Sequence, residues 1–171
     1  GSSLAVNPGQ ALGLAGGAIS VSGATLRAPA GAVHLTAVAG AGEVPVAPGN
    51  GRPTVTQRGD VVIAANSLLD VSDPANLGSG GSVVIRAANL TVDGSEINAD
   101  NYGAGGGGVI ILSAQNRIAL ADNADVHSFA LSTGAVGAAG EVSALCARSG
   151  VADRARTAAI AVRPERRGIF A

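Results

Sequence analysis

The stretch GSVVIRAANLTVD, residues 81–93, begins with a glycine, continues as a β-prone run, and resumes its apolar alternation after Ala-Ala-Asn. Similar runs recur along the chain. Six of them begin with a glycine, at Gly17, Gly31, Gly59, Gly81, Gly108 and Gly140. Alternating, β-branched residues favour strands, and glycine marks sites where another backbone approaches closely. The recurrence therefore predicts many short strands whose corners depend on these glycines.

The spacing of the runs indicates a repeating architecture. Val61, Val83 and Val109 follow one another at intervals of 22 and 26 residues, which is the range of solenoid repeats. Residues 1–147 carry no 3.6-residue apolar period over three turns, so helical repeats are not expected. A sandwich or closed barrel would need hairpins, and neither Asn50-Gly51 nor Asp93-Gly94 is flanked by strands on both sides. We therefore expect an all-β solenoid with coils about 4.8 Å apart.

Three of the runs end on asparagine after small residues, at Asn66, Asn89 and Asn116. If these residues lay at one corner of successive coils, their amides could bond to one another as an internal ladder. A buried amide that is satisfied in this way avoids a penalty of roughly 1–3 kcal/mol. Because their offsets from the preceding valine differ, ordinary turn residues are the alternative interpretation.

Composition excludes several classes of partner. The chain has no lysine, and residues 1–147 hold five arginines against ten acidic residues, whereas residues 148–171 hold six against two. With only three aromatic residues and no basic stripe on the body, nucleic-acid binding is not expected. Cys146 is the only cysteine, so no intrachain disulfide forms. No apolar run approaches the roughly 20 residues of a membrane-spanning helix, so stable membrane insertion is not expected.

Residues 10–44, GQALGLAGGAISVSGATLRAPAGAVHLTAVAGAGEV, resemble a segment of the filamentous-haemagglutinin-like exoproteins of bacterial two-partner secretion. The positions that carry the pattern are Gly16, Gly17, Ile19, Val21, Gly23, Leu26, Ala28, Gly31, Val33, Leu35 and Val38-Ala39-Gly40. Residues 59–145 are similar to the haemagglutinin-type repeats that follow in that family, so the resemblance covers about residues 8–146.

The resemblance implies a right-handed parallel β-helix from a Gram-negative bacterium, exported through an outer-membrane transporter and secreted or displayed at the cell surface as an adhesin. The family's secretion domain is marked by Asn-Pro-Asn motifs, and this chain has only Val6-Asn7-Pro8-Gly9. Recognition by the transporter is therefore expected to reside in an N-terminal domain outside this sequence. The receptor on a host or other cell is not identified by any motif.

Two parts of the chain are distinguished. Residues 1–147 are expected to form the repeat domain, and residues 148–171 an Arg-rich tail that fits no coil. In the tail, Val151, Ala155, Ala158, Ala159 and Val162 fall at helical spacing. A short helix that caps the open end of the solenoid would protect its strand edges. A disordered basic tail and a membrane-surface element are the alternatives.

Residues 103–108, GAGGGG, match the dinucleotide-binding pattern G-x-G-x-x-G, but they precede a strand instead of linking a strand to a helix. A phosphate loop of the Walker type would also need a lysine. We interpret the glycines as a corner, with Tyr102–Gly105 as a loop that lengthens this repeat. Trimming one or two of residues 103–106 is therefore expected to be tolerated.

Acidic residues recur as three pairs at spacing i, i+3. On stacked coils they could approach one another and bind Ca²⁺ through oxygen ligands, although turn formation by aspartate is the simpler explanation. The pairs are Asp70 with Asp73, Asp93 with Glu96, and Asp122 with Asp125. Calcium is the one metal that these residues suggest, and no cofactor is expected.

The sequence favours a non-catalytic, rod-forming fragment of a secreted adhesin. The alternative is a β-helical polysaccharide lyase or hydrolase that uses clustered aspartates, since two flanking carboxylates suffice for sugar cleavage. Few arginines and few aromatics near the acidic pairs argue against that enzyme. Cys146 and His127 could in principle form a nucleophile–base pair, but Cys146 lies in an apolar run typical of a buried thiol.

Overall fold

The computed structural model describes residues 1–45, 53–75, 78–130 and 140–146. These residues form strands that pair in parallel and contain no helix, which confirms the predicted all-β class. The strands are β1 (Ser2–Ala5), β2 (Ala11–Gly16), β3 (Ile19–Ser22), β4 (Ala24–Arg27), β5 (Ala32–Ala37), β6 (Val61–Ala64), β7 (Leu68–Asp70), β8 (Ser82–Asp93), β9 (Glu96–Asn98), β10 (Val109–Ala121), β11 (Asp125–His127) and β12 (Glu141–Cys146).

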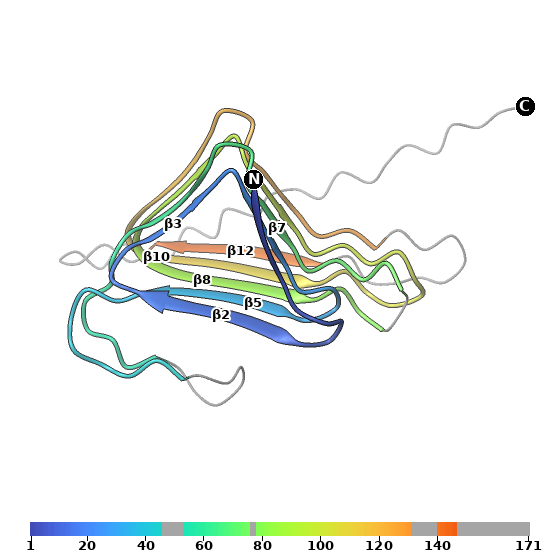
Figure 1. Ribbon diagram of the computed structural model, residues 1–171, viewed down its shortest axis with the longest axis horizontal. Helices are drawn as coiled ribbons and strands as arrows, with labels where there is room; N and C mark the ends of the chain where they lie inside the picture. Colours follow the sequence, from blue (N-terminus) through green and yellow to red (C-terminus); the bar gives the residue numbers. More distant parts are fainter. Residues whose placement is uncertain (46–52, 76–77, 131–139, 147–171) are drawn as a thin grey trace, which may run out of the picture.

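The strands follow a triangular course, with successive turns of the chain stacked on one another (Figure 1). Side A is the sheet β1-β4-β7-β9-β11. Side B is the row β2, β5, β8, β10 and β12, of which β8 and β10 contribute residues 82–87 and 109–114. Side C consists of β3, β6 and the second halves of β8 and β10, residues 89–93 and 117–121. A search of the described segments for a helix able to span a membrane finds none.

The core is a set of aliphatic columns inside the triangle. Since side chains alternate along a strand, every second residue points inward, and the parallel register places equivalent residues of successive turns directly over one another. The central residues of the columns are fully buried. The columns are Leu4, Leu26, Leu69, Ile97 and Val126 on side A; Leu12, Val33, Val83, Ile110 and Val142 on side B; and Val21, Ile63, Val92 and Leu120 on side C.

Four of the six predicted glycines stack at the corner between sides A and B. The amide after each of the last three donates to the carbonyl oxygen of the glycine one turn earlier: Ser82 to Gly31 at 2.9 Å, Val109 to Gly81 at 3.0 Å and Glu141 to Gly108 at 3.0 Å. A Cβ on Gly108 would lie 2.0 Å from the Gly81 oxygen, and one on Gly140 would lie 2.5 Å from the Gly108 oxygen. Glycine is thus required by close backbone approach, as the sequence predicted.

The other two predicted glycines belong to a different corner. Gly17 and Gly59 lie together between sides B and C, where a Cβ on Gly59 would be 1.6 Å from the Gly17 oxygen. Val61 accordingly pairs with Ile19 and Leu90, whereas Val83 pairs with Val33 and Ile110. The predicted alignment of Val61 with Val83 was wrong, because each turn contains similar apolar runs on different sides.

An arm between β5 and β6 explains why the repeat was misaligned. The chain leaves the corner between sides B and C with residues 38–45 and returns to it with residues 53–58. The two segments contact each other, since the amide of Thr54 donates to the Glu43 oxygen at 3.0 Å. At its end, Arg58 donates from Nη1 to Ser113 Oγ at 3.1 Å and from its backbone amide to Gln115 Oε1 at 3.0 Å. The arm inserts residues between the side B and side C strands of one turn and is anchored on β10.

The asparagine ladder does not form, because Asn66 lies at a different corner from the other two and a register shift separates Asn89 from Asn116. Asn66 lies between sides C and A with a positive φ of 58°, in a left-handed turn. Asn89 lies between sides B and C, where its Nδ2 donates to Asp60 Oδ1 at 2.8 Å. Asn116 lies at that corner too, but a register shift pairs Asn89 with Arg117 instead.

Buried polar residues are instead stacked at the corner between sides A and B, where Asp73 and Asn101 are fully buried neighbours. Asp73 Oδ2 accepts from the Gly78 amide at 2.9 Å. Asn101 Nδ2 donates to the Gly78 and Gly106 oxygens at 2.7 and 3.0 Å, and its Oδ1 accepts from the Gly103 amide at 2.7 Å. Because Asn101 holds the loop at both ends, the expectation that this loop tolerates trimming is not supported.

Candidate functional site

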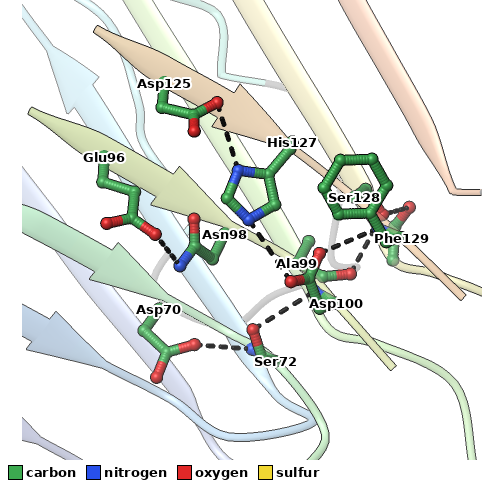
Figure 2. Close-up of polar contacts among 11 residues, drawn as sticks. Asp70, Ser72, Glu96, Asn98, Ala99, Asp100, Asp125, His127, Ser128 and Phe129 are labelled. Atoms are coloured by element: carbon green, nitrogen blue, oxygen red, sulfur yellow. Dashed lines mark hydrogen bonds and ion pairs between the residues drawn. The ribbon is translucent and has the colours of Figure 1, made fainter. Parts of the chain in front are cut away.

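The outward surface of side A carries most of the described charged side chains that interact with one another. One column of this surface contains Arg27, Asp70, Asn98 and His127 on successive turns. Arg27 Nε lies 3.2 Å from Asp70 Oδ2. The next outward column contains Glu96 and Asp125. These short strands therefore place acidic, amide and basic side chains in rows, although they are far apart in sequence (Figure 2).

His127 is the centre of the closest group, which we call the His127 cluster: Asp100, Asp125, His127 and Phe129. Its Nε2 lies 3.3 Å from Asp100 Oδ2, and its Nδ1 lies 3.2 Å from Asp125 Oδ1. The ring stacks on Phe129 with centroids 4.8 Å apart. Figure 2 shows the imidazole between the two carboxylates, of which Asp100 is buried and Asp125 is exposed.

The two carboxylates determine the protonation of His127. The hydrogen bond to Asp100 makes the largest contribution, and the charge of Asp100 together with Asp125 adds to it, while burial acts in the opposite direction. The pKa of His127 is raised from 6.5 to about 9. At neutral pH the side chain is therefore an imidazolium that forms ion pairs with both carboxylates, and it does not have a lone pair available as a general base.

The remaining polar groups around the cluster are bound to the backbone. Asp100 Oδ1 accepts from the Phe129 amide at 2.8 Å, and Ser72 Oγ accepts from the Asp100 amide at 3.2 Å. Ser128 is buried, with its Oγ 2.9 Å from the carbonyl oxygens of both Ala99 and Gly108. This hydroxyl connects one turn to the next and is not positioned as a nucleophile for an external substrate.

The six calcium candidates are distributed over several positions. Asp70 pairs with Arg27, and Asp73 is buried at the corner between sides A and B. The register places Asp70 beside Asn98 and Glu96 beside Asp125, so the three pairs do not stack as pairs. Within the parts of the chain that the structure describes, no three His, Cys, Asp or Glu side chains form a group able to hold a metal ion.

Asp93 and Asp122 belong to two different predicted pairs, and their carboxyl groups interact across turns. A hydrogen bond with Asp122 is the main cause that raises the pKa of Asp93, followed by burial and by the charge of Asp122. The two groups lie near the corner between sides C and A, where Asp122 adopts a positive φ of 48°. Their arrangement fits turn formation, the alternative interpretation of these residues.

Sequence reasoning missed the importance of Asp100 and Asn101. These residues lie in the segment after β9, between Asn98 and the predicted loop at Tyr102–Gly105, and no role was predicted for them. The signal that would have found them is the serine, aspartate or asparagine that follows β7, β9 and β11, as in Ser72-Asp73, Asp100-Asn101 and Ser128. Cys146 ends β12 beside Asn116, with its thiol donating to the Asn116 oxygen at 2.9 Å, and does not contact His127.

Comparisons of the chain with protein-family models, with curated proteins and with solved structures give no match.

Proposed function

We propose that the chain is a right-handed parallel β-helix that forms part of a secreted, surface-displayed, adhesin-like exoprotein of the filamentous-haemagglutinin type, without catalytic activity of its own. In this proposal the stacked turns make a stiff rod that carries binding regions away from the cell. A different part of the exoprotein engages the outer-membrane transporter. The receptor in this proposal is a molecule of the cell to which the exoprotein attaches.

The observation that carries the proposal is the continuous stacking of three sides. Parallel ladders join β2 to β5, β5 to β8, β8 to β10 and β10 to β12 on side B, and equivalent ladders follow sides A and C. Each turn contacts its neighbours through backbone hydrogen bonds and aliphatic columns. A solenoid of this kind derives its stability from neighbouring repeats and extends by adding them.

The enzymatic alternative would use the carboxylates of side A. Sugar cleavage needs one carboxyl group that is protonated and a second that is free to attack or to activate water. In the His127 cluster, Asp100 is held by the imidazolium and by the Phe129 amide, and Ser128 is bonded between turns. These contacts favour a structural role for the cluster and support the non-catalytic proposal.

Adhesion is tested with the purified chain coupled to beads and presented to epithelial and bacterial cells. The expected result is attachment that exceeds that of beads carrying Gly108→Val protein, in which the corner between sides A and B is disrupted. Equal attachment by both proteins would contradict the proposal, because it would not depend on the folded rod. In parallel, acidic polysaccharides are incubated with the chain with and without Ca²⁺, and turnover that is lost in His127→Gln would favour the enzyme instead.

A further inference from the structure

The arm between β5 and β6 returns to side B with an arginine that is held in a fixed position. The backbone amide of Arg58 donates to Gln115 Oε1 at 3.0 Å, and Gln115 Nε2 donates to the Thr56 oxygen at 3.3 Å. One side chain of β10 therefore binds the arm backbone at two points. The Arg58 side chain then donates from Nη1 to Ser113 Oγ at 3.1 Å, which places its guanidinium on the outward surface of side B.

The partners of Arg58 are neutral. Among the described residues, no carboxylate lies within ion-pair distance of its guanidinium. The bond to Ser113 uses one of the five N–H donors of this group. The Ser113 hydroxyl accepts that bond and keeps its own proton to donate. Both side chains thus have donors available for a further acceptor.

A second arginine lies beside this pair. The parallel register places Arg86 of β8 next to Ser113 and Thr36 next to Arg86, on strands about 4.8 Å apart. Thr36 faces outward yet is only 3% exposed, so this end of side B is sheltered from solvent. The charge of Arg86 also extends to His34, because it lowers the pKa of His34 after burial does. We call these five residues the basic patch.

The acidic residues of the chain lie elsewhere. Of the described strands of side B, only β12 carries an acidic residue, Glu141, in the column of Ser82 and Val109. The column of Arg86 and Ser113 is four residues further along the strands, or about 13 Å away. Residues 1–147 contain five arginines against ten acidic residues, so two of the five lie together on an acidic body. A local positive potential of this kind attracts anions.

The arrangement of the donors indicates which anion fits. The guanidinium comes from the arm and the hydroxyl from β10, so they approach a shared acceptor from different directions. A tetrahedral oxyanion accepts hydrogen bonds from several directions, whereas a carboxylate offers its two oxygens in one plane. The two arginine charges match the two negative charges of sulfate or of ionised phosphate. Shelter from solvent strengthens this attraction.

We propose that the basic patch binds a free tetrahedral dianion, sulfate or phosphate, at the guanidinium of Arg58, with the Ser113 hydroxyl as a second donor and the charge of Arg86 beside it. The bound dianion joins the arm to β10 and offsets the repulsion between the two arginines. This inference does not depend on the adhesin proposal, because it concerns a small anion and its test needs no cell or receptor.

The test is a sulfate titration of the full chain at constant ionic strength, with sodium chloride as the balancing salt. His34 and His127 are the two histidines of the chain, so NMR can follow both rings separately. Sulfate is expected to raise the pKa of His34 by at least about 0.3 in a saturable manner, because the bound dianion offsets the charge of Arg86. The pKa of His127, on side A, is expected to stay unchanged.

Two variants separate the site from a general effect of salt. Arg58→Gln removes the guanidinium but keeps the backbone amide that binds Gln115, and it is expected to abolish the response of His34. Arg117→Gln, on the side C half of β10, makes the same change in net charge outside the patch and is expected to leave the response intact. A raised pKa of His127 in both variants shows that they are folded.

Two further probes identify the group that is bound. Acetate, which is planar and carries one charge, is expected to give no saturable response. Glucose 6-sulfate, an ester with one charge, is expected to require at least about tenfold higher concentrations than sulfate. An equal response to chloride, an unchanged response in Arg58→Gln or saturation by acetate would overturn the site. An ester that binds as tightly as sulfate would overturn its assignment to a free dianion.

Discussion

Single glycines determine how closely the turns approach one another. At Gly108 an added Cβ would lie 2.0 Å from the Gly81 oxygen and 2.9 Å from the Ala99 oxygen, and both neighbours are backbone atoms. A backbone atom cannot move aside without breaking the ladder that it belongs to. Gly13, on the outward surface of β2, has no atom within 4 Å of the equivalent position.

Gly108→Val is therefore expected to lower the free energy of unfolding by about 2–4 kcal/mol, as overpacking at a site without room does. Gly13→Val is the control and is expected to change it by less than about 0.5 kcal/mol. Urea titration followed by circular dichroism measures both. Equal stability of the two variants would mean that the glycine stacking does not hold the turns together.

His127 makes stability depend on pH in a defined direction. Because its pKa is raised from 6.5 to about 9 in the folded chain, the folded state binds the proton more tightly than the unfolded state. The stabilisation is complete below pH 6.5 and is lost as the pH rises through about 9. We expect wild type to lose on the order of 2–3 kcal/mol across this interval relative to His127→Gln. Denaturant titrations at several pH values measure this difference.

His34 provides the control with the opposite sign. Burial, and then the charge of Arg86, lower the pKa of His34 below 6.5, so its unfolded state binds the proton more tightly. Relative to His34→Gln, wild type is expected to lose stability as the pH falls below 6.5, and to show no difference at alkaline pH. An alkaline loss that persists in His127→Gln would show that another group is responsible.

At the scale of the strand, burial differs sharply along one column. Leu69 in β7 is fully buried between Leu26 and Ile97, whereas Leu4 in β1 belongs to the same column and is 44% exposed. Leu69→Ala is expected to cost about 2–5 kcal/mol, since it removes a buried side chain and leaves a cavity. Leu4→Ala is expected to cost less than about 1 kcal/mol. Thermal and urea unfolding of the two variants test whether the column is the core of the molecule.

Alternation of Val, Ile and Leu after glycine predicted the existence and type of most strands, because burial inside a parallel stack imposes that pattern on every side. Because the pattern is the same on every side, it does not show which strands pair with one another. A side B run such as Val83–Ile85 and a side C run such as Val61–Ile63 look alike, and the arm between β5 and β6 shifts one against the other. Only pairing in space distinguishes them.

The polar sites were harder to predict for a related reason. Asp100 and His127 meet because the parallel register of β9 and β11 places His127 beside Asn98, two residues before Asp100, and sequence spacing does not report that contact. The acidic residues at spacing i, i+3 were conspicuous in the sequence, but in the structure they take part in separate turns and ion pairs. Of the buried polar residues, Asp73 was predicted only as a calcium candidate, and no role was predicted for Asn101.

At the scale of the whole molecule, each turn is supported mainly by the turns on either side of it. β8 lies between β5 and β10 and pairs with both of them over side B, whereas β1 pairs only with β4 within the described part of the chain. We expect the amides of β8 to exchange with solvent most slowly and those of β1 and β12 most rapidly. Hydrogen exchange followed by mass spectrometry measures this order, and uniform protection from end to end would contradict it.

The ladders also determine how the molecule responds to force. The hydrogen bonds from Ser82 to Gly31, Val109 to Gly81 and Glu141 to Gly108 all point from one turn to the next, along the stacking direction. Tension in that direction loads each interface by opening its hydrogen bonds directly, whereas tension along a strand must slide many of them at once. We therefore expect the chain to unfold one turn at a time under tension along the stacking direction, and to withstand far larger forces under tension along the strands.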